Sequence, residues 1–399
     1  MKFAHIADCH LGSWREEKIR QLNAKAFSKA ISESIDEKVD FVIIAGDLFN
    51  TSLPPIESLK LAVMEFKKLK DKNIPVYIIE GSHDFSPSGK TMIDVLEQAG
   101  LAVNVARAEE TEDKLRLKFT TDKKTGAKIA GMIGKKGGLE KSFFAEIDYE
   151  NVGAEKGFKI FVFHSAIDEL KPKDLANMDS APMSLLPKGF SYYASGHVHC
   201  RMTKQIKDYG LVVYPGPLFP NNFSELEKES GGYFIYDNGN LIFKPVDVIK
   251  THSIEIDCAN KAPEQINSQI ISELKNKKLD NTIVLLRLSG MLGSGRISEI
   301  DFREIFKTAA EQNAYFVMKN TSKLATREFE EVKVSTSNIE QIEADLIKEN
   351  VGQIQIGKDE TKLVRQLMTL LDAEKNEGEF NRDFEARIRK DLAKIFEID

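Results

Sequence analysis

Histidines and aspartates gather in this chain where short apolar runs end, and this clustering constrains the fold more than any other feature. Five of the seven histidines belong to such clusters. Polar groups at the carboxyl ends of parallel strands face the crevice where open α/β sheets bind ligands. The pattern therefore predicts strands that deliver their end residues to one site. The clusters are Asp8-Cys9-His10, Gly46-Asp47, Ser82-His83-Asp84, His164 and Gly196-His197-Val198-His199.

The first hundred residues alternate between strand and helix patterns. Apolar runs at residues 3–7, 41–45 and 76–79 have the length of buried strands, whereas residues 18–38 and 56–69 have helical periodicity. This alternation predicts repeated βαβ units. Strand signals then become denser up to about residue 256, which favours a second sheet packed on the first. We expect an α/β domain of two packed β-sheets flanked by helices at residues 1–250.

The rest of the chain predicts smaller units. A small α+β cap domain is expected at residues 251–334, followed by a polar linker at 335–357 and a two-helix arm at 358–399. Each arm helix has one apolar stripe at a spacing of three and four residues. That spacing leaves self-packing and partner binding equally open. The stripes comprise Leu363, Val364, Leu367, Leu370 and Leu371, then Phe384, Ile388, Leu392, Ile395 and Phe396.

Composition excludes several classes of protein. No apolar run approaches the ~20 residues of a membrane-spanning helix, and the opening strand is too short for a secretory signal. Cys9, Cys200 and Cys258 are odd in number and widely spaced, which fits a reducing compartment. We therefore expect a cytoplasmic protein. The net charge of −6 means that any nucleic-acid binding rests on a local surface or on metal ions.

The clusters favour a metal centre. In an extended chain, residues two apart point to the same side, so Asp8 can join His10 and His197 can join His199. Carboxylates with imidazoles suit manganese, iron or zinc, and Asp47 is the natural bridge between two ions roughly 3.5–4 Å apart. Two such ions would activate a water and neutralise phosphodiester charge. No Gly-x-Ser-x-Gly elbow is present, which disfavours a nucleophilic triad.

In order and spacing, these clusters resemble the signatures of calcineurin-like metallophosphoesterases over about residues 1–250. A finer pattern resembles the SbcD-type double-strand-break repair nucleases of archaea and bacteria, and the cap and arm agree with it. The finer pattern consists of Met-Lys-Phe-Ala-His-Ile-Ala-Asp-Cys-His-Leu-Gly at the start, Ile44-Ala45-Gly46-Asp47-Leu48-Phe49, and Val213-Tyr214-Pro215-Gly216-Pro217.

The resemblance implies two Mn²⁺ ions. His83 would be the catalytic residue that stabilises or protonates the leaving oxygen. Asp84 would orient His83, although a role as a turn or helix cap is almost as plausible. One ion would be held by Asp8, His10, Asp47 and His199, and the other by Asp47, Ser82, His164 and His197.

Two positions depart from the family pattern. Ser82 stands where the family has an asparagine ligand, and Asn50 stands where many members have a histidine. A serine hydroxyl is shorter than an asparagine amide and a poorer ligand for a hard cation. Since losses even around the ligands cost roughly 10–100-fold in affinity or activity, Ser82 is expected to weaken the second metal. Asn50 would impair DNA positioning and leave the metals intact.

The resemblance also implies a function and partners. The family uses manganese as a 3′–5′ exonuclease and as an endonuclease on single-stranded or hairpin DNA. It acts on DNA ends and would place the protein near the nucleoid, with residues 251–334 as a DNA-binding cap. The arm would dock on the coiled coil of an SbcC-type ABC ATPase. A homodimer would form through helices at about residues 24–35 and 56–69, with Leu59, Val63 and Phe66 as candidate contacts or ordinary core residues.

Two rival functions remain open. One is a different phosphoesterase of the same fold that acts on nucleotides or phosphoproteins. The other is a scaffold that tethers DNA ends and whose catalysis is impaired by Ser82.

Overall fold

The computed structural model describes residues 1–86, 89–111, 114–134, 140–175, 177–228, 230–326, 360–373 and 381–396. The chain divides into two units, Met1–Arg327 and Glu328–Asp399. The predicted linker at 335–357 lies outside the described residues. No helix in the described parts is long and apolar enough to cross a membrane.

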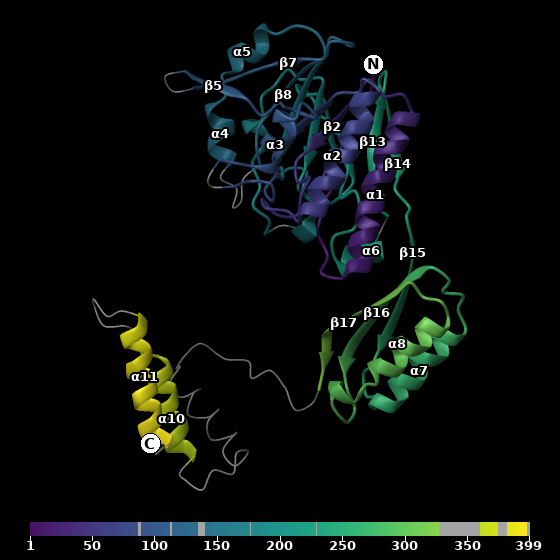
Figure 1. The fold of residues 1–399 in the computed structure, drawn as a ribbon, viewed down its shortest axis with the longest axis vertical. Coiled ribbons are helices and arrows are strands. Elements are labelled where there is room, and N and C mark those ends of the chain that lie inside the picture. Colours follow the sequence, from purple (N-terminus) through teal and green to yellow (C-terminus); the bar gives the residue numbers. More distant parts are fainter. Residues whose placement is uncertain are drawn as a thin grey trace. The chain divides into compact units, whose positions relative to one another are not determined.

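The first sheet is built from four parallel strands and an antiparallel hairpin, in the order β14-β13-β1-β2-β3-β4. Figure 1 shows β2, β13 and β14 of this sheet with the helices α1 and α2. Long helices connect the parallel strands and cover the outer face. The strands are β1 (Lys2–Ile6), β2 (Phe41–Ala45), β3 (Val76–Ile79), β4 (Val103–Asn104), β13 (Gly232–Asp237) and β14 (Asn240–Pro245). The helices are α1 (Glu17–Asp36), α2 (Ile56–Asp71) and α3 (Met92–Gln98).

The second sheet has the order β11-β12-β10-β9-β8-β7, in which the four central strands run parallel. Its strands are β7 (Thr120–Thr121), β8 (Lys128–Gly131), β9 (Lys159–His164), β10 (Tyr192–Gly196), β11 (Met202–Gln205) and β12 (Leu211–Tyr214). Nearby elements are the β5 (Ala108–Thr111) and β6 (Lys114–Leu117) ribbon, the helices α4 (Glu140–Glu146), α5 (Tyr149–Ala154) and α6 (Phe223–Lys228), and the 3₁₀ turns η2 (Lys173–Leu175) and η3 (Met183–Leu185).

The two sheets pack face to face through fully buried apolar side chains. Phe3, Ile43 and Ile79 from the first sheet belong to the same core as Val162 and Tyr192 from the second. Parallel strands covered on both faces are expected to be apolar throughout, which explains the continuous apolar runs in the sequence. The predicted arrangement of two packed sheets flanked by helices is confirmed.

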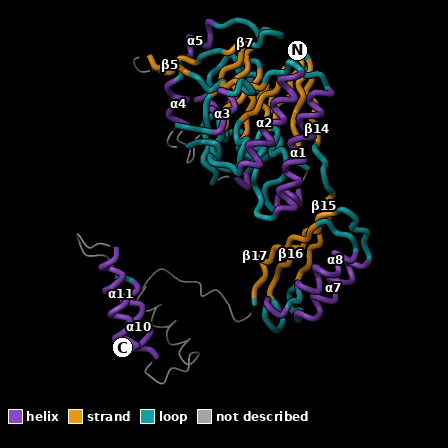
Figure 2. Tube along the Cα trace, viewed as in Figure 1, coloured by secondary structure: helices purple, strands orange, loops and turns teal. Residues whose placement is uncertain are grey.

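A three-stranded parallel sheet follows, in the order β15-β16-β17. Figure 2 shows that two helices lie along one side of it. Its elements are β15 (Lys250–Asp257), α7 (Pro263–Lys275), β16 (Thr282–Met291), the 3₁₀ turn η4 (Ile297–Glu299), α8 (Phe302–Glu311) and β17 (Phe316–Ala325). Ile266 and Ile305 of the helices pack on Leu286, whereas Ile283 and Leu285 of β16 belong to the core beneath α1 and α2. We refer to residues 250–326 as the cap.

The second unit contains the helices α10 (Glu360–Leu371) and α11 (Asn381–Phe396), which lie side by side. Both were expected from the apolar stripes. Leu363 is buried, but the side chain of Leu371 is 76% exposed, and Met368 and Phe396 are also exposed. Packing of the two helices on each other therefore covers only part of their apolar surface.

The proposed dimer contacts differ in exposure. Phe66 is fully buried in the core beneath α1 and α2, so its role is core packing. Leu59 and Val63 are partly buried against the same core. The exposed apolar residues at this helix are Ile56 and Met64.

Candidate metal centre

The carboxyl ends of strands from both sheets meet at one site, held by backbone hydrogen bonds between loops. The amide of Asp8 donates to the carbonyl of Gly46 at 3.2 Å, and the amide of His10 donates to the carbonyl of Asp47 at 3.0 Å. From the second sheet, the amide of His197 donates to both carboxylate oxygens of Asp8 at 2.9 and 3.1 Å. These hydrogen bonds therefore hold the loops to one another independently of any ligand.

The backbone at this site is not extended, contrary to the alternation assumed from the sequence. Asp8 and His10 have φ values of 49° and 44°, and His197 and His199 have 87° and 53°. Left-handed conformations of this kind are uncommon for residues other than glycine. Both members of each pair still face the site, but tight turns direct them there. Cys9, which lies between Asp8 and His10, packs into the core.

One group of ligand atoms comprises Asp8, His10 and His199. His10 Nε2 lies 2.9 Å from His199 Nε2, and Asp8 Oδ1 lies 3.8 Å from His199 Nε2. His10 and Asp8 are almost fully buried. Two imidazole nitrogens and a carboxylate directed at one point are a ligand set that suits a divalent transition metal.

A second group comprises Asp8, Asp47 and His164. His164 donates through Nδ1 to the carbonyl of Ala45 at 2.9 Å, which leaves Nε2 as the free nitrogen. That nitrogen is buried 3.1 Å from Asp47 Oδ2 and has no hydrogen-bond partner among the described residues. An unsatisfied buried nitrogen beside a carboxylate fits a metal ligand, because a cation would satisfy both atoms.

A third group comprises His10, Asp47 and His83, so Asp47 is shared between the second and third groups. Ser82 and His197 lie beside the second. Asp47 Oδ2 lies 3.7 Å from His10 Nε2, and it accepts a hydrogen bond from the Ser82 hydroxyl at 3.4 Å. The His197 ring centre lies 5.2 Å from that of His164. The structure thus brings all seven predicted ligands to one site, although His197 and Ser82 are outside the tight groups that the described residues form.

Burial and mutual charge strongly shift the pKa values of these residues. Burial lowers the pKa of His10 to about 3, although the Asp47 charge opposes this shift. Burial also disfavours the charged form of His164, but Asp47 and Asp8 outweigh it and raise the pKa of His164 to about 10. Burial raises the pKa of Asp8. Carboxylates and imidazoles packed so closely compete for protons, and divalent cations would remove that competition.

Two glycines leave the space that these side chains occupy. A Cβ atom on Gly46 would lie 2.3 Å from His164 Nδ1, and one on Gly81 would lie 2.2 Å from Asp47 Oδ1. Gly46 also has a φ of 85°. No other residue type fits either position without displacing a predicted ligand.

Residues 1–201 match the calcineurin-like phosphoesterase family, which is half of the chain. The chain belongs to this family. As a calcineurin-like phosphoesterase, it is a metal-dependent enzyme that hydrolyses phosphoesters, and candidate ligand groups for such metals are present in its structure.

Within the calcineurin-like phosphoesterases, the chain is similar to archaeal proteins named DNA double-strand break repair protein Mre11. The Methanocaldococcus jannaschii protein is 29% identical over 272 residues, which cover 65% of this chain and 67% of the relative. The Archaeoglobus fulgidus protein is 25% identical over an alignment of 424 positions, covering 100% of this chain and 92% of the relative. The Sulfolobus acidocaldarius protein is 27% identical over 397 positions, covering 94% and 97%.

His83 stands at the edge of this phosphoesterase site. Its amide donates to Asp47 Oδ1 at 2.7 Å, and its Nδ1 lies 2.7 Å from the carbonyl oxygen of Asn50. The ring centre lies 4.7 Å from that of His10. An Nδ1–H donated to Asn50 leaves the other ring nitrogen available for proton transfer. The side chain of Asn50 plays no part in this contact, because the acceptor is its backbone oxygen.

Asp84 organises the turn. Its carboxylate accepts hydrogen bonds from the amides of Leu48, Phe49 and Gly81 at 2.9 to 3.1 Å. Within the described parts of the chain, the His83 ring contacts the Asn50 carbonyl and the His10 ring instead. The turn role is therefore the one that the structure supports for Asp84, and the orienting role falls to the Asn50 carbonyl.

Glu225 of α6 was not predicted as a site residue. Its Oε1 lies 3.1 Å from His199 Nδ1, on the side of the ring opposite the metal groups. In the sequence, Glu225 follows Asn222 at the spacing of a helix cap, and Asn222 Oδ1 does accept from the Glu225 amide. Because that local role already explains the presence of Glu225 in the sequence, its contact with His199 could not be predicted. Nearby, the Trp14 indole donates to the carbonyl of Pro220, just ahead of α6.

Proposed function

We propose that the chain is a manganese-dependent DNA nuclease that acts on DNA ends during double-strand break repair. The similarity to the Archaeoglobus Mre11 protein carries this proposal, because it extends over the whole chain and not only over the phosphoesterase region. A phosphoesterase that acts on nucleotides or phosphoproteins has no evident use for the residues beyond 250. We assign 3′–5′ exonuclease activity and single-strand or hairpin endonuclease activity to this site.

Two Mn²⁺ ions would be held at the strand ends. When bound, they supply positive charge that neutralises phosphate oxygens and makes water acidic enough to attack at neutral pH. Asp47 Oδ2 lies 3.7 Å from His10 Nε2 and 3.1 Å from His164 Nε2, which supports a bridging role for this carboxylate. The first ion is assigned to Asp8, His10, Asp47 and His199, and the second to Asp47, Ser82, His164 and His197.

We assign to His83 the donation of a proton to the leaving oxygen. The hydrogen bond from Nδ1 to Asn50 fixes the ring so that its second nitrogen stays available. The amide of His83 is also tied to Asp47 Oδ1, which couples the position of the ring to the bridging carboxylate. General acid catalysis of this kind typically contributes about 10²- to 10⁴-fold in rate.

The remaining regions are assigned to partners. We assign the cap to DNA, the α10 and α11 arm to a coiled-coil ABC ATPase of the SbcC type, and the α2 face to a homodimer contact. The exposed side chains of Leu371 and Phe396 support a partner for the arm, and those of Ile56 and Met64 support a partner for α2. The protein would work in the cytoplasm, close to the nucleoid.

One observation favours a second candidate function, a DNA-end scaffold with weak catalysis. The Ser82 hydroxyl donates to Asp47 and so engages the carboxylate that both metals would share. A site that loses its second ion would bind DNA and cleave it slowly.

Cleavage of labelled DNA by the full chain separates these functions. With Mn²⁺, we expect products from a 3′-labelled duplex and from a hairpin, and a chelator should abolish them. His83→Gln should lower the rate by about 10²- to 10⁴-fold while calorimetry shows unchanged Mn²⁺ binding. DNA binding without any product at saturating Mn²⁺ would establish the scaffold. Hydrolysis of nucleotides or phosphopeptides alone would establish a different phosphoesterase.

A further inference from the structure

Helix α6 carries two carboxylates that face different parts of the protein. Glu225 and Glu227 are two positions apart in this six-residue helix. Side chains at that spacing leave an α-helix about 200° apart. One carboxylate contacts the metal centre and the other contacts the cap. The helix is anchored between them, because Leu226 is buried in the main core.

Glu225 is held in place on its own side. Its Oε2 accepts from the amide of Asn221 at 2.7 Å, and its Oε1 accepts from Asn222 Nδ2 at 2.5 Å. The same Oε1 lies 3.1 Å from His199 Nδ1. A proton donated from Nδ1 to this carboxylate leaves the lone pair on Nε2, the nitrogen that lies 2.9 Å from His10 Nε2. Partners of this kind fix the tautomer and the ring orientation of metal-binding histidines.

Glu227 is held from the cap. Arg287 of β16 donates to it through both Nε, at 2.9 Å, and Nη2. Both side chains are largely covered, with 16% and 21% exposure. The Arg287 guanidinium also lies over the ring of Phe223, at the start of α6, 5.1 Å from its centre. Planar bidentate pairs with an added ring contact resist sliding, so α6 is expected to follow β16.

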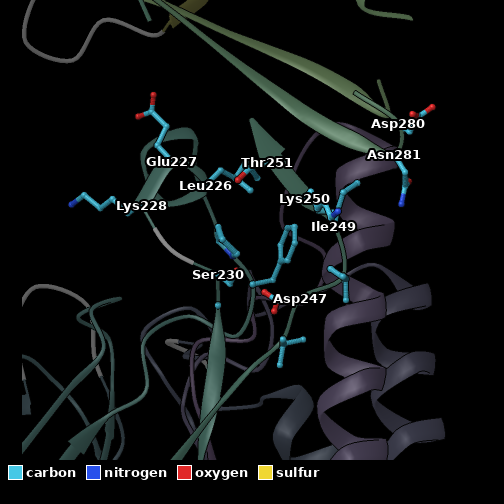
Figure 3. Close-up of a pocket in the computed structure, with 15 residues that line it drawn as sticks. Leu226, Glu227, Lys228, Ser230, Asp247, Ile249, Lys250, Thr251, Asp280 and Asn281 are labelled. Atoms are coloured by element: carbon cyan, nitrogen blue, oxygen red, sulfur yellow. The ribbon is translucent and has the colours of Figure 1, made fainter. Parts of the chain in front are cut away.

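A cavity of about 800 Å³ lies beside this contact (Figure 3). Leu226 and Glu227 of α6 line it, together with Asp280 and Asn281 of the cap. The segment at residues 246–251, which joins the cap to the two packed sheets (the sandwich), also lines it. The cavity leaves part of this junction unpacked, although Leu226 of α6 shares a buried core with Ile283 and Leu285 of β16. The ion pair adds a directional polar contact to that apolar packing.

We propose that Glu225 is a positioning residue for His199, and that the Glu227–Arg287 ion pair makes the position of His199 depend on the cap. The proposal rests on the metal centre assigned above. A change in the position of the cap would alter the site of the first metal, because Arg287 would move α6 and α6 would move the imidazole ring of His199.

Mn²⁺ calorimetry on the full chain, without DNA, tests the role of Glu225. Glu225→Ala should weaken one Mn²⁺ site by about 10- to 100-fold, as expected for loss of a partner behind a ligating histidine. Glu225→Gln keeps an acceptor for Nδ1–H and should recover most of the affinity. Asn222→Ala is the comparison variant: it removes the cap of α6 and one of the two donors that hold the Glu225 carboxylate, but it leaves the Asn221 amide and the contact with His199, so we expect a smaller loss than in Glu225→Ala. Equal losses in Glu225→Ala and Asn222→Ala would reduce Glu225 to a helix cap and overturn the proposal.

A double-mutant cycle tests the connection to the cap. Arg287→Gln should weaken the same Mn²⁺ site by roughly threefold, within the range of partly exposed ion pairs, and should add nothing in the Glu225→Ala background. Tyr315→Phe is the control, because it removes a different contact between cap and sandwich, from the Tyr315 hydroxyl to the carbonyl of Lys18. Additive losses, or an equal loss in Tyr315→Phe, would overturn the route through α6.

The two levels of proposal fail differently. If the wild-type chain binds no Mn²⁺, the metal centre itself is wrong and the inference falls with it. If the wild-type chain binds Mn²⁺ and cleaves DNA while Glu225→Ala binds it equally well, only the inference is wrong. Melting curves of every variant separate a local change at His199 from unfolding.

Discussion

Left-handed backbone occurs both at the metal centre and in the cap, but on different residue types. In the cap it falls on Asn260, Asn281 and Asn313, and asparagine tolerates this conformation because its short side chain can bond locally. At the candidate metal centre it falls on residues assigned as metal ligands, where such a conformation costs of order 1–3 kcal/mol each. These residues are Asp8, His10, Asp47, His197 and His199. The cap turns therefore use a residue type that suits left-handed backbone, whereas the strand ends keep aspartate and histidine in spite of its cost.

The two regions also differ in what holds these turns. Asp8 is fully buried and accepts the amide of His197, and its own amide bonds to Gly46. In the cap, Asn281 is exposed, and its amide donates to the carbonyl of Asn313. Buried hydrogen bonds across two sheets can maintain an unfavourable φ that a surface turn could not. Strain and burial therefore occur together at the metal centre.

The largest expected effect comes from a matched pair of glycine variants. Gly46→Ala adds a Cβ 2.3 Å from His164 Nδ1 at a φ of 85°. A ligand displaced by about 1 Å can cost roughly 100-fold in rate, and we expect at least that loss in Mn²⁺-dependent DNA cleavage. Gly290→Ala in the cap has a φ of 98° and a Cβ 2.7 Å from Asp257 Oδ1. It should lower the melting temperature but leave Mn²⁺ affinity unchanged. An equal loss of Mn²⁺ affinity in Gly46→Ala and Gly290→Ala would contradict the difference drawn between the metal centre and the cap.

The next effect concerns Ser82. Ser82→Asn supplies an amide oxygen in place of a hydroxyl that now donates to Asp47 at 3.4 Å. We expect the weaker Mn²⁺ site to gain about tenfold in affinity, at the lower end of the effects seen around metal ligands. Anomalous scattering from Mn²⁺-soaked crystals of both proteins measures the occupancy. Equal occupancy at the second position would remove Ser82 as the weak point of the site.

A smaller effect is expected in the cap. Asn281 has a φ of 50°, so Asn281→Ala should lower the free energy of unfolding by about 1 kcal/mol, whereas Asn281→Gly should be nearly neutral. Urea unfolding with the same probe for all three proteins measures the difference. If alanine were tolerated as well as glycine, the cap turn would not depend on the tolerance of asparagine for this backbone.

The smallest effect lies at the opposite end of β1. Glu37 accepts hydrogen bonds from Lys2 at 2.6 Å and from Lys244 at 2.5 Å, and these lower its pKa from 4.5 to about 2. A lowered carboxyl pKa contributes stability above the unfolded value, and that stability is lost as pH falls from 4.5 toward 2. Glu37→Gln should therefore cost less than about 1 kcal/mol at neutral pH. Urea unfolding of both proteins should show this difference shrinking across that acidic range, and a constant difference would contradict it.

The sequence could predict that these residues converge because they follow strands. Asp47 and His164 each end a buried apolar run, so their convergence followed from a parallel sheet. The conformation of Asp8 and His10 did not follow, because positive φ on such residues results from contacts with distant loops. The extended backbone assumed from the sequence correctly predicted that both side chains face the site, but left-handed turns direct them there.

Glu225 shows a different limit. A helix of six residues has too few turns for a periodic signal, and the Asn222 to Glu225 spacing already has a complete explanation as a helix cap. The contact of Glu225 with His199 joins residues 26 positions apart. Likewise, only the structure could show that the Asn50 backbone, and not Asp84, contacts the His83 ring.

Trp14 gives the molecule an optical property. It is the one tryptophan of the chain, and its indole donates to Pro220 at the segment that leads into α6. Light absorbed at the red edge of the protein spectrum is therefore emitted from a single point beside this helix. The wavelength of that emission depends on how much water reaches the indole. Unlabelled protein thus carries its own fluorescent probe for displacement of the loop before α6.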